Sequence, residues 1–142
     1  MSLSCYATLS EKIADKSAAV GIIGLGYVGL PLAVTIAKRG LNVTGFDVDP
    51  RKMAALAAAQ SYIEAVEDAD LVALNAAGKV AWTHDFSVLS QMDVIVICVP
   101  TPLSQNREPD IRFVRTAAEA VARYLRPGQL VLLESTTYPG TT

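Results

Sequence analysis

The chain contains few of the residues that build disulfide frameworks or metal centres. Its 142 residues include two cysteines, Cys5 and Cys98, and a single histidine, His84. With so few thiols we expect no disulfide framework and a reducing compartment such as the cytoplasm. His84 has no cysteine or acid cluster near it in the sequence, so we expect a surface residue and no metal site. Cys98 lies inside an apolar run, which predicts a buried core residue rather than a nucleophile.

Charge is also sparse. Charged residues make up 18% of the chain, the formal net charge is −2, and no run of basic residues is present. We therefore expect neither a nucleic acid nor an anionic membrane as a partner. Residues 18–37 carry no charge, but four glycines and a proline interrupt them, which indicates a turn rather than a membrane span. Residues 1–17 are polar, and we interpret them as an N-terminal tail with a short helix over 10–15 and no signal peptide.

Against this background, one glycine-rich stretch is prominent. An apolar strand over 19–23 runs into Gly24, Gly26 and Gly29, and helical spacing of apolar residues follows as far as Arg39. Strand, glycine turn and helix are the context in which G-x-G-x-x-G indicates dinucleotide binding. The first glycine permits a tight turn, the second lets a diphosphate approach the backbone, and the third brings helix and strand together. The N–H groups and dipole at the start of the helix favour an anion.

An acid closes the next strand. Asp47 lies 18 residues after Gly29, close to the offset of about 20 residues at which an acid holds the adenosine ribose. A carboxylate there accepts hydrogen bonds from ribose hydroxyls and repels a 2′-phosphate, which favours NAD over NADP. Asp49 and Pro50 predict the start of the following helix. Its first turn contains Arg51 and Lys52, either of which could be a solvated cation or lean over the cofactor.

Strands alternate with helices along the rest of the chain. This pattern predicts an α/β fold, namely a Rossmann-type doubly wound parallel sheet in a single three-layer domain over residues 18–142, with strand order 3-2-1-4-5. A six-strand version would need one more helix and strand, before which the given sequence stops. After the apolar run 93–99, Thr101 stands between two prolines at the carboxyl edge of the sheet. That position fits a ligand contact, although a rigid turn without a ligand role is the alternative.

Three motifs in the same order resemble one known family. Residues 24–33, 98–103 and 134–142 are similar to the N-terminal domain of the nucleotide-sugar 6-dehydrogenases, the UDP-glucose/GDP-mannose dehydrogenase family. The segment 11–16 and the closing block most resemble the UDP-N-acetylglucosamine branch. Gln60 departs from the pattern, because a glycine is expected there. The resemblance implies oxidation of the C6 alcohol of a nucleotide sugar to a carboxylate by two hydride transfers to NAD, in polysaccharide biosynthesis.

The resemblance also implies roles for individual residues. Asp47 would hold the ribose, Lys52 would be the basic NAD contact, and the residues wrapping the pyrophosphate would be Gly24, Gly26, Tyr27, Val28 and Gly29. Thr101 and Thr136 would line the nicotinamide side, and Thr136 would also hold a catalytic water. The family's cysteine nucleophile, its lysine and its asparagine would lie beyond Thr142, as would the second domain that binds the nucleotide-sugar substrate. We therefore expect this chain to bind NAD without completing the oxidation, and the parent to be a homo-oligomer.

Two other interpretations remain open from the sequence. One is a stand-alone module that senses a dinucleotide and signals to a partner. The other is a β-hydroxyacid-type dehydrogenase, which shares the glycine turn but not the Pro100-Thr101-Pro102 block. The apolar fifth strand at the sheet edge further predicts that the chain self-associates.

Overall fold

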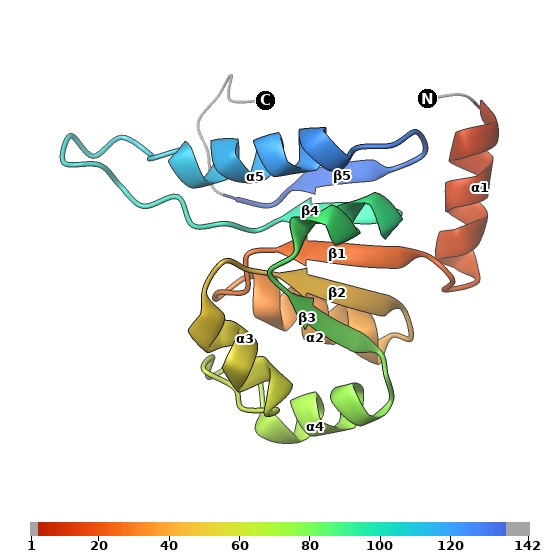
Figure 1. The fold of residues 1–142 in the computed structure, drawn as a ribbon, viewed down its shortest axis with the longest axis horizontal. Helices are drawn as coiled ribbons and strands as arrows, with labels where there is room; N and C mark the ends of the chain where they lie inside the picture. The colour runs from red at the N-terminus through yellow and green to blue at the C-terminus, as the bar shows by residue number, and fades with distance from the viewer. Residues whose placement is uncertain (1–2, 136–142) are drawn as a thin grey trace.

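The computed structural model describes residues 3–135, which form a five-stranded, fully parallel sheet. The strand order is β3-β2-β1-β4-β5, which confirms the predicted order. The strands are β1 (Ala19–Ile23), β2 (Asn42–Phe46), β3 (Val80–Thr83), β4 (Val94–Ile97) and β5 (Leu130–Leu133). All carboxyl ends of the strands therefore meet at one edge of the sheet, on the left in Figure 1.

Helices cover both faces of this sheet, as expected for a doubly wound fold. They are α1 (Leu3–Ala14), α2 (Gly29–Lys38), α3 (Pro50–Ala57), α4 (Asp68–Ala76), the 3-10 helix η1 (Phe86–Gln91) and α5 (Arg112–Tyr124). Residues of α2, α3 and α4 share one core cluster with the sheet, whereas residues of η1 and α5 share the cluster on the other face. The result is the predicted three-layer arrangement (Figure 1).

The central strand β4 shows why its sequence is continuously apolar. Val94 and Val96 belong to the core cluster under α2, and Ile95 and Ile97 belong to the cluster under α5. A parallel strand covered on both faces needs an apolar side chain at every position. The buried Cys98 continues the α2 side of this core, as predicted from the sequence.

The start of α3 follows the capping signal of the sequence, whereas the inner face of α5 differs from the sequence prediction. Asp49 caps α3 by accepting a hydrogen bond from the Arg51 N–H, with Pro50 as the first helical residue, as predicted. Helical spacing of the apolar residues predicts an inner face of α5 made of Ile111, Val114, Ala118, Val121, Ala122 and Leu125. The structure differs from this set. The buried residues are Val114, Ala117 and Val121. Leu125 is exposed because the helix ends at Tyr124 and the backbone of Leu125 is already extended.

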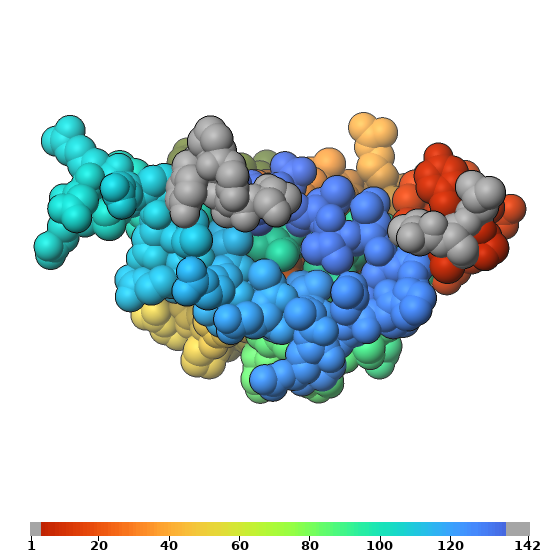
Figure 2. Space-filling model, turned by 90° about the horizontal axis from the view of Figure 1, so that it is seen from above, coloured from red at the N-terminus to blue at the C-terminus, as the bar shows by residue number. Residues whose placement is uncertain are grey.

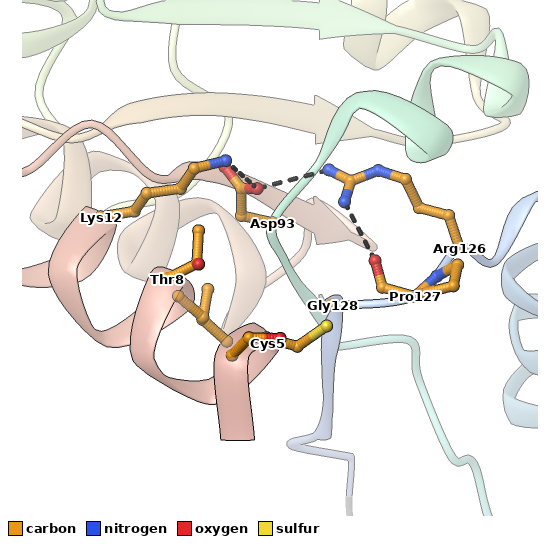
Figure 3. Close-up of a pocket in the computed structure, with 9 residues that line it drawn as sticks. Cys5, Thr8, Lys12, Asp93, Arg126, Pro127 and Gly128 are labelled. Atoms are coloured by element: carbon orange, nitrogen blue, oxygen red, sulfur yellow. Dashed lines mark hydrogen bonds and ion pairs between the residues drawn. The ribbon is translucent and has the colours of Figure 1, made fainter. Parts of the chain in front are cut away.

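The amino-terminal segment forms more structure than the short helix expected over residues 10–15. Helix α1 spans twelve residues, and its Leu9 is buried in the core. Lys12 Nζ lies 3.2 Å from Asp93 Oδ1 at the amino ends of the strands. Arg126 Nη2 approaches the same oxygen at 3.3 Å, so Lys12 and Arg126 converge on one carboxylate (Figure 3). A long-range ion pair between residues 81 positions apart explains why local sequence signals underestimate this helix.

Helix α1 and the long connection from β4 to α5 lie at opposite ends of the molecule (Figure 2). The connection, residues 98–111, projects beyond the carboxyl edge of the sheet and folds back on itself through a bridge between Leu103 and Pro109. Among residues 3–135, no helix is long and apolar enough to cross a membrane.

Candidate cofactor-binding site

The glycine turn joins β1 to α2 at the carboxyl edge, as the sequence predicts. Gly24 has a φ of +94°, and its N–H donates to the carbonyl of Phe46 over 2.8 Å. A side chain at Gly24 would place its Cβ 2.7 Å from the carbonyl oxygen of Cys98. The turn therefore requires glycine both for its left-handed backbone and for its contact with the chain that follows β4.

Gly29 and Gly26 differ sharply in the space around them. A Cβ on Gly29 would overlap the carbonyl oxygen of Gly24, because α2 begins in direct contact with the turn. A Cβ on Gly26 would meet no atom within 4 Å. The third glycine is therefore needed for packing, whereas the second leaves open space beside bare main chain. That space fits a group that must approach the backbone closely, as a diphosphate does.

Backbone donors without a partner among the described residues lie in the same turn. Within residues 3–135, the N–H groups of Gly26, Tyr27 and Val28 donate to no other residue. The side chains of Tyr27 and Val28 are 86% and 56% exposed, so neither belongs to the core. Unpaired N–H groups at the start of α2, together with the helix dipole, form a site for an anion.

Asp47 lies directly after β2 and is only 9% exposed. Its Oδ2 accepts a hydrogen bond from the Leu25 N–H over 2.9 Å, and its Oδ1 accepts one from the Asp49 N–H over 3.0 Å. A carboxylate offers about four acceptor positions, so capacity remains for hydroxyl donors. The acid thus contacts the glycine turn itself, and its role as the ribose contact stays a prediction.

Lys52 and Arg51, the two possible basic contacts of the cofactor on α3, have different surroundings. The Lys52 ammonium lies 3.5 Å from Asp47 Oδ2, and its side chain is 32% exposed. Arg51 instead pairs with Asp49 over 3.2 Å, and its side chain is 90% exposed. Lys52 therefore shares the site with Asp47, whereas Arg51 extends into solvent.

A cleft of about 740 Å³ runs along the carboxyl edge beside Asp47. Asp47, Asp49 and Lys52 line its polar side near the glycine turn, and Thr116, Glu119 and Arg123 of α5 add further polar groups. Its apolar wall includes Ile23, Phe46, Phe86, Val99, Ala117 and Tyr124. The rings of Phe46 and Phe86 lie 5.7 Å apart at a tilt of 40°. An apolar slot next to a buried carboxylate is suited to a nucleoside, because the flat base enters the slot while the ribose hydroxyls reach the acid.

The remaining residues singled out from the sequence are Thr101, Thr136, Cys98 and His84. Thr101 is half-buried beyond the end of β4, and although neighbouring Pro100 lines the cleft, Thr101 does not. Thr136 lies outside the described residues. Burial, with a smaller effect from the charge of Glu134, raises the pKa of the Cys98 thiol to about 11, so the thiol is protonated at neutral pH. His84 is exposed, and residues 3–135 contain no cluster of three metal-ligating side chains.

Sequence reasoning missed Tyr62. Its hydroxyl donates to the carbonyl of Leu25 over 2.6 Å, which ties the connection between α3 and α4 to the glycine turn. The two residues are 37 positions apart, and no local pattern around Tyr62 indicates the contact. The aromatic contribution of Phe86 to the cleft was likewise not predicted from the sequence.

Comparison with known proteins gives a consistent result. Residues 18–142 match the UDP-glucose/GDP-mannose dehydrogenase family, NAD binding domain. The UDP-N-acetyl-D-glucosamine 6-dehydrogenase of Pseudomonas aeruginosa is 35% identical over 127 residues, which cover 89% of this chain and 29% of the relative. The UDP-N-acetyl-D-mannosamine dehydrogenase of Pyrococcus horikoshii is 36% identical over 124 residues, which cover 87% of this chain and 29% of the relative.

Solved structures show the same relationship. A UDP-glucose dehydrogenase from Pyrobaculum islandicum has a TM-score of 0.80 at 33% identity, over 88% of this chain and 30% of that one. A ternary complex of the GDP-mannose dehydrogenase from Pseudomonas aeruginosa has a TM-score of 0.80 at 32% identity, over 86% and 29% of the two chains. The chain thus spans under a third of the length of these relatives. It belongs to the UDP-glucose/GDP-mannose dehydrogenase family, and residues 18–142 correspond to that family's NAD binding domain.

Proposed function

We propose that this chain is the cofactor-binding part of a longer enzyme that oxidises the C6 alcohol of a UDP-N-acetylhexosamine to the uronate. The observation that carries the proposal is the open space at Gly26 beside a buried Asp47, on a chain of this family. Relatives at 35% and 36% identity act on UDP-N-acetylglucosamine and UDP-N-acetylmannosamine according to their names, which supports this sugar class. NAD, when bound, accepts the hydride in each of the two oxidation steps.

The residues of this chain bind and orient that cofactor. The N–H groups of Gly26, Tyr27 and Val28 donate to the diphosphate, and Gly24 and Gly29 keep the turn tight enough to present them. Asp47 accepts hydrogen bonds from the ribose hydroxyls, and Lys52 lies close enough to hold the acid in place. The apolar wall of the cleft covers the adenine, which excludes water from that end of the cofactor.

Asp47 also determines which dinucleotide binds. A 2′-phosphate on the ribose would approach a nearly buried carboxylate, and like charges in a poorly hydrated site repel strongly. Lys52 offsets only part of this repulsion, because its ammonium is already paired with Asp47. We therefore propose NAD rather than NADP as the cofactor that this site selects.

The remaining roles lie toward the nicotinamide and beyond this chain. We propose that Thr101 and Thr136 line the nicotinamide side and that Thr136 positions a catalytic water. The nucleophile and the nucleotide-sugar pocket come from the rest of the parent enzyme. The uronate product would serve polysaccharide biosynthesis in the cytoplasm, which agrees with the reduced state expected for Cys98.

Isothermal titration calorimetry with NAD and NADP tests the proposal directly. We expect the chain to bind NAD and to bind NADP much more weakly. Asp47→Asn keeps the shape of the side chain and removes its charge, so it should weaken NAD binding by about 1–3 kcal/mol and narrow the preference over NADP. Arg51→Gln, on the exposed neighbour, is the matched control and should bind like the parent sequence. Equal affinity for both dinucleotides, or no binding of either, would contradict the proposal.

We also propose that the chain self-associates through β5, the edge strand of the described sheet. Val131 and Leu132 are each 39% exposed, and the outer backbone groups of an edge strand are available for pairing. Sedimentation velocity over a range of concentrations should show a dimer or larger species. Leu132→Lys, which places a charge on this edge, should shift the distribution toward monomer, whereas a monomer at every concentration would contradict this assignment.

A further inference from the structure

Leu25 occupies a special place in the glycine turn, because side chains from two other elements hold its backbone. Its N–H donates to Asp47 Oδ2 over 2.9 Å, and its carbonyl accepts from the Tyr62 hydroxyl over 2.6 Å. The Leu25 side chain is fully buried, which fixes the residue from a third direction. Both peptide groups that flank Leu25 are therefore anchored from outside the turn.

The second of these peptide groups contains the Gly26 N–H. The Leu25 carbonyl and the Gly26 N–H belong to one planar trans peptide unit, in which the C=O and N–H bonds point in opposite directions. A hydroxyl that holds the carbonyl on one side therefore fixes the N–H toward the other side. At Gly26 that N–H has no partner within residues 3–135, and a Cβ on the same residue would meet no atom within 4 Å.

We infer that Tyr62 is a positioning residue for the cofactor's diphosphate, acting through the Leu25–Gly26 peptide group. This inference rests on the proposed NAD site. Without the hydroxyl, the peptide group could rotate, and the Gly26 N–H would be aimed at the diphosphate for only part of the time. Part of the binding free energy would then be lost in ordering the turn.

The surroundings of Tyr62 keep it a donor. Burial raises the pKa of its phenol, and the negative charges of Asp47 and Asp49 raise it further, so the hydroxyl retains its proton throughout the neutral range. The Lys52 ammonium lies 5.7 Å from the centre of the Tyr62 ring and 3.5 Å from Asp47 Oδ2. Tyr62, Lys52 and Asp47 thus form one connected group around Leu25, and the ring and the hydroxyl of Tyr62 have separable tasks.

Tyr62→Phe tests the hydroxyl alone, because it keeps the ring that faces Lys52. Tyr62 is 36% exposed, so removal of its hydroxyl leaves the core unchanged and the variant is expected to fold. Tyr6→Phe is the matched control, since Tyr6 lies on α1 and is 66% exposed. Calorimetry would compare NAD and ADP-ribose, which carry a diphosphate, and an NMR titration would add adenosine, which carries none.

We expect Tyr62→Phe to weaken NAD and ADP-ribose by the same factor, about threefold to tenfold, as for one lost hydrogen bond. Adenosine binding should change by less than about twofold, and the Gly26 amide resonance should shift in the variant without ligand. Tyr6→Phe should change none of these. Equal weakening of all three ligands, or unchanged NAD affinity in Tyr62→Phe, would overturn the role of Tyr62 while leaving the NAD site intact. If the unsubstituted chain bound no NAD, the proposed function itself would fail, and the inference with it.

Discussion

Asp47 and Asp93 are two carboxylates with nearly the same burial at opposite ends of the same sheet. Asp47 follows β2 and is 9% exposed, and Asp93 precedes β4 and is 7% exposed. Asp93 accepts from the Ala19 N–H over 2.8 Å and pairs with Lys12 and Arg126, with α1 packed beside it. Asp47 also accepts backbone N–H groups, but it borders a cleft of about 740 Å³.

The difference teaches that burial alone does not distinguish an acid enclosed by its partners from an acid that borders an open cleft. At the amino end, two cations and a backbone N–H satisfy Asp93, and the Arg126 guanidinium also donates to the carbonyls of Ser90 and Met92. The small cavity of about 180 Å³ beside them is thus bordered by groups that already hold one another (Figure 3). At the carboxyl end, the turn presents unpaired N–H groups beside Asp47, which is where ligands bind in open parallel sheets.

The largest expected effects concern two glycines of the turn. Substitution of Gly29 should lower the stability of the fold, whereas substitution of Gly26 should weaken NAD binding. Gly29→Ala should lower the free energy of unfolding by about 3 kcal/mol or more, because its Cβ would overlap the Gly24 carbonyl oxygen. Gly26→Ala should change that free energy by less than about 0.5 kcal/mol, since its Cβ meets no atom within 4 Å. It should nevertheless weaken NAD about tenfold or more by occupying the space of the diphosphate. Urea unfolding and calorimetry on both variants would measure this, and a destabilised Gly26→Ala would contradict the assignment.

Replacing each of the two carboxylates by its amide tests whether Asp93 serves the stability of the fold and Asp47 serves NAD binding. Asp93→Asn should destabilise the fold by about 2–3 kcal/mol, because two cations lose their shared counter-charge, although both are partly solvated. NAD affinity should stay unchanged in that variant. Asp47→Asn should show the opposite result, with weaker NAD binding and a smaller loss of stability. If both variants lost the same stability and the same affinity, the distinction between the two ends would be wrong.

The pH dependence of stability tests the structural role of Asp93 further. Burial alone would raise the pKa of Asp93, but the Ala19 N–H and the contacts with Lys12 and Arg126 outweigh it, so its pKa lies below the ordinary value. Stability from this group is therefore fully present above the ordinary pKa of about 4 and is lost as the pH falls through the lowered value. The stability gap between the parent sequence and Asp93→Asn should be constant above about pH 5 and shrink below about pH 4. Urea unfolding across this range would show it, and a gap that widened in acid would contradict the sign.

Much of the fold and part of the site could be predicted from local patterns. The glycine turn, the strand order and the position of Asp47 follow from residues close in sequence, whose spacing is set by one β-α-β unit. The length of α1 could not be predicted, because Lys12 finds its partner Asp93 only in the folded chain. Tyr62 was missed for the same reason, since its hydroxyl reaches Leu25 across 37 positions. The Lys52 assignment came from the family resemblance, because helix periodicity alone leaves Arg51 and Lys52 equivalent.

The smallest expected effects concern single cations. Lys12→Met should lower stability by about 1 kcal/mol, because its partner Asp93 is nearly buried. Arg51→Met should change it by less than about 0.5 kcal/mol, because its ion pair with Asp49 is mostly solvated. High salt should reduce the Arg51 effect further. Thermal unfolding of both variants would compare them, and a larger loss in Arg51→Met would contradict the ranking.

The most direct test of the account follows backbone amides at both ends of the sheet during an NAD titration of the ¹⁵N-labelled chain. Our prediction is that the amide resonances of Gly26, Tyr27 and Val28 shift progressively and saturate with NAD, while that of Ala19, bound to Asp93, stays in place. A titration in which Ala19 shifted and the glycine turn did not, or in which NADP produced the same shifts at the same concentrations, would contradict it.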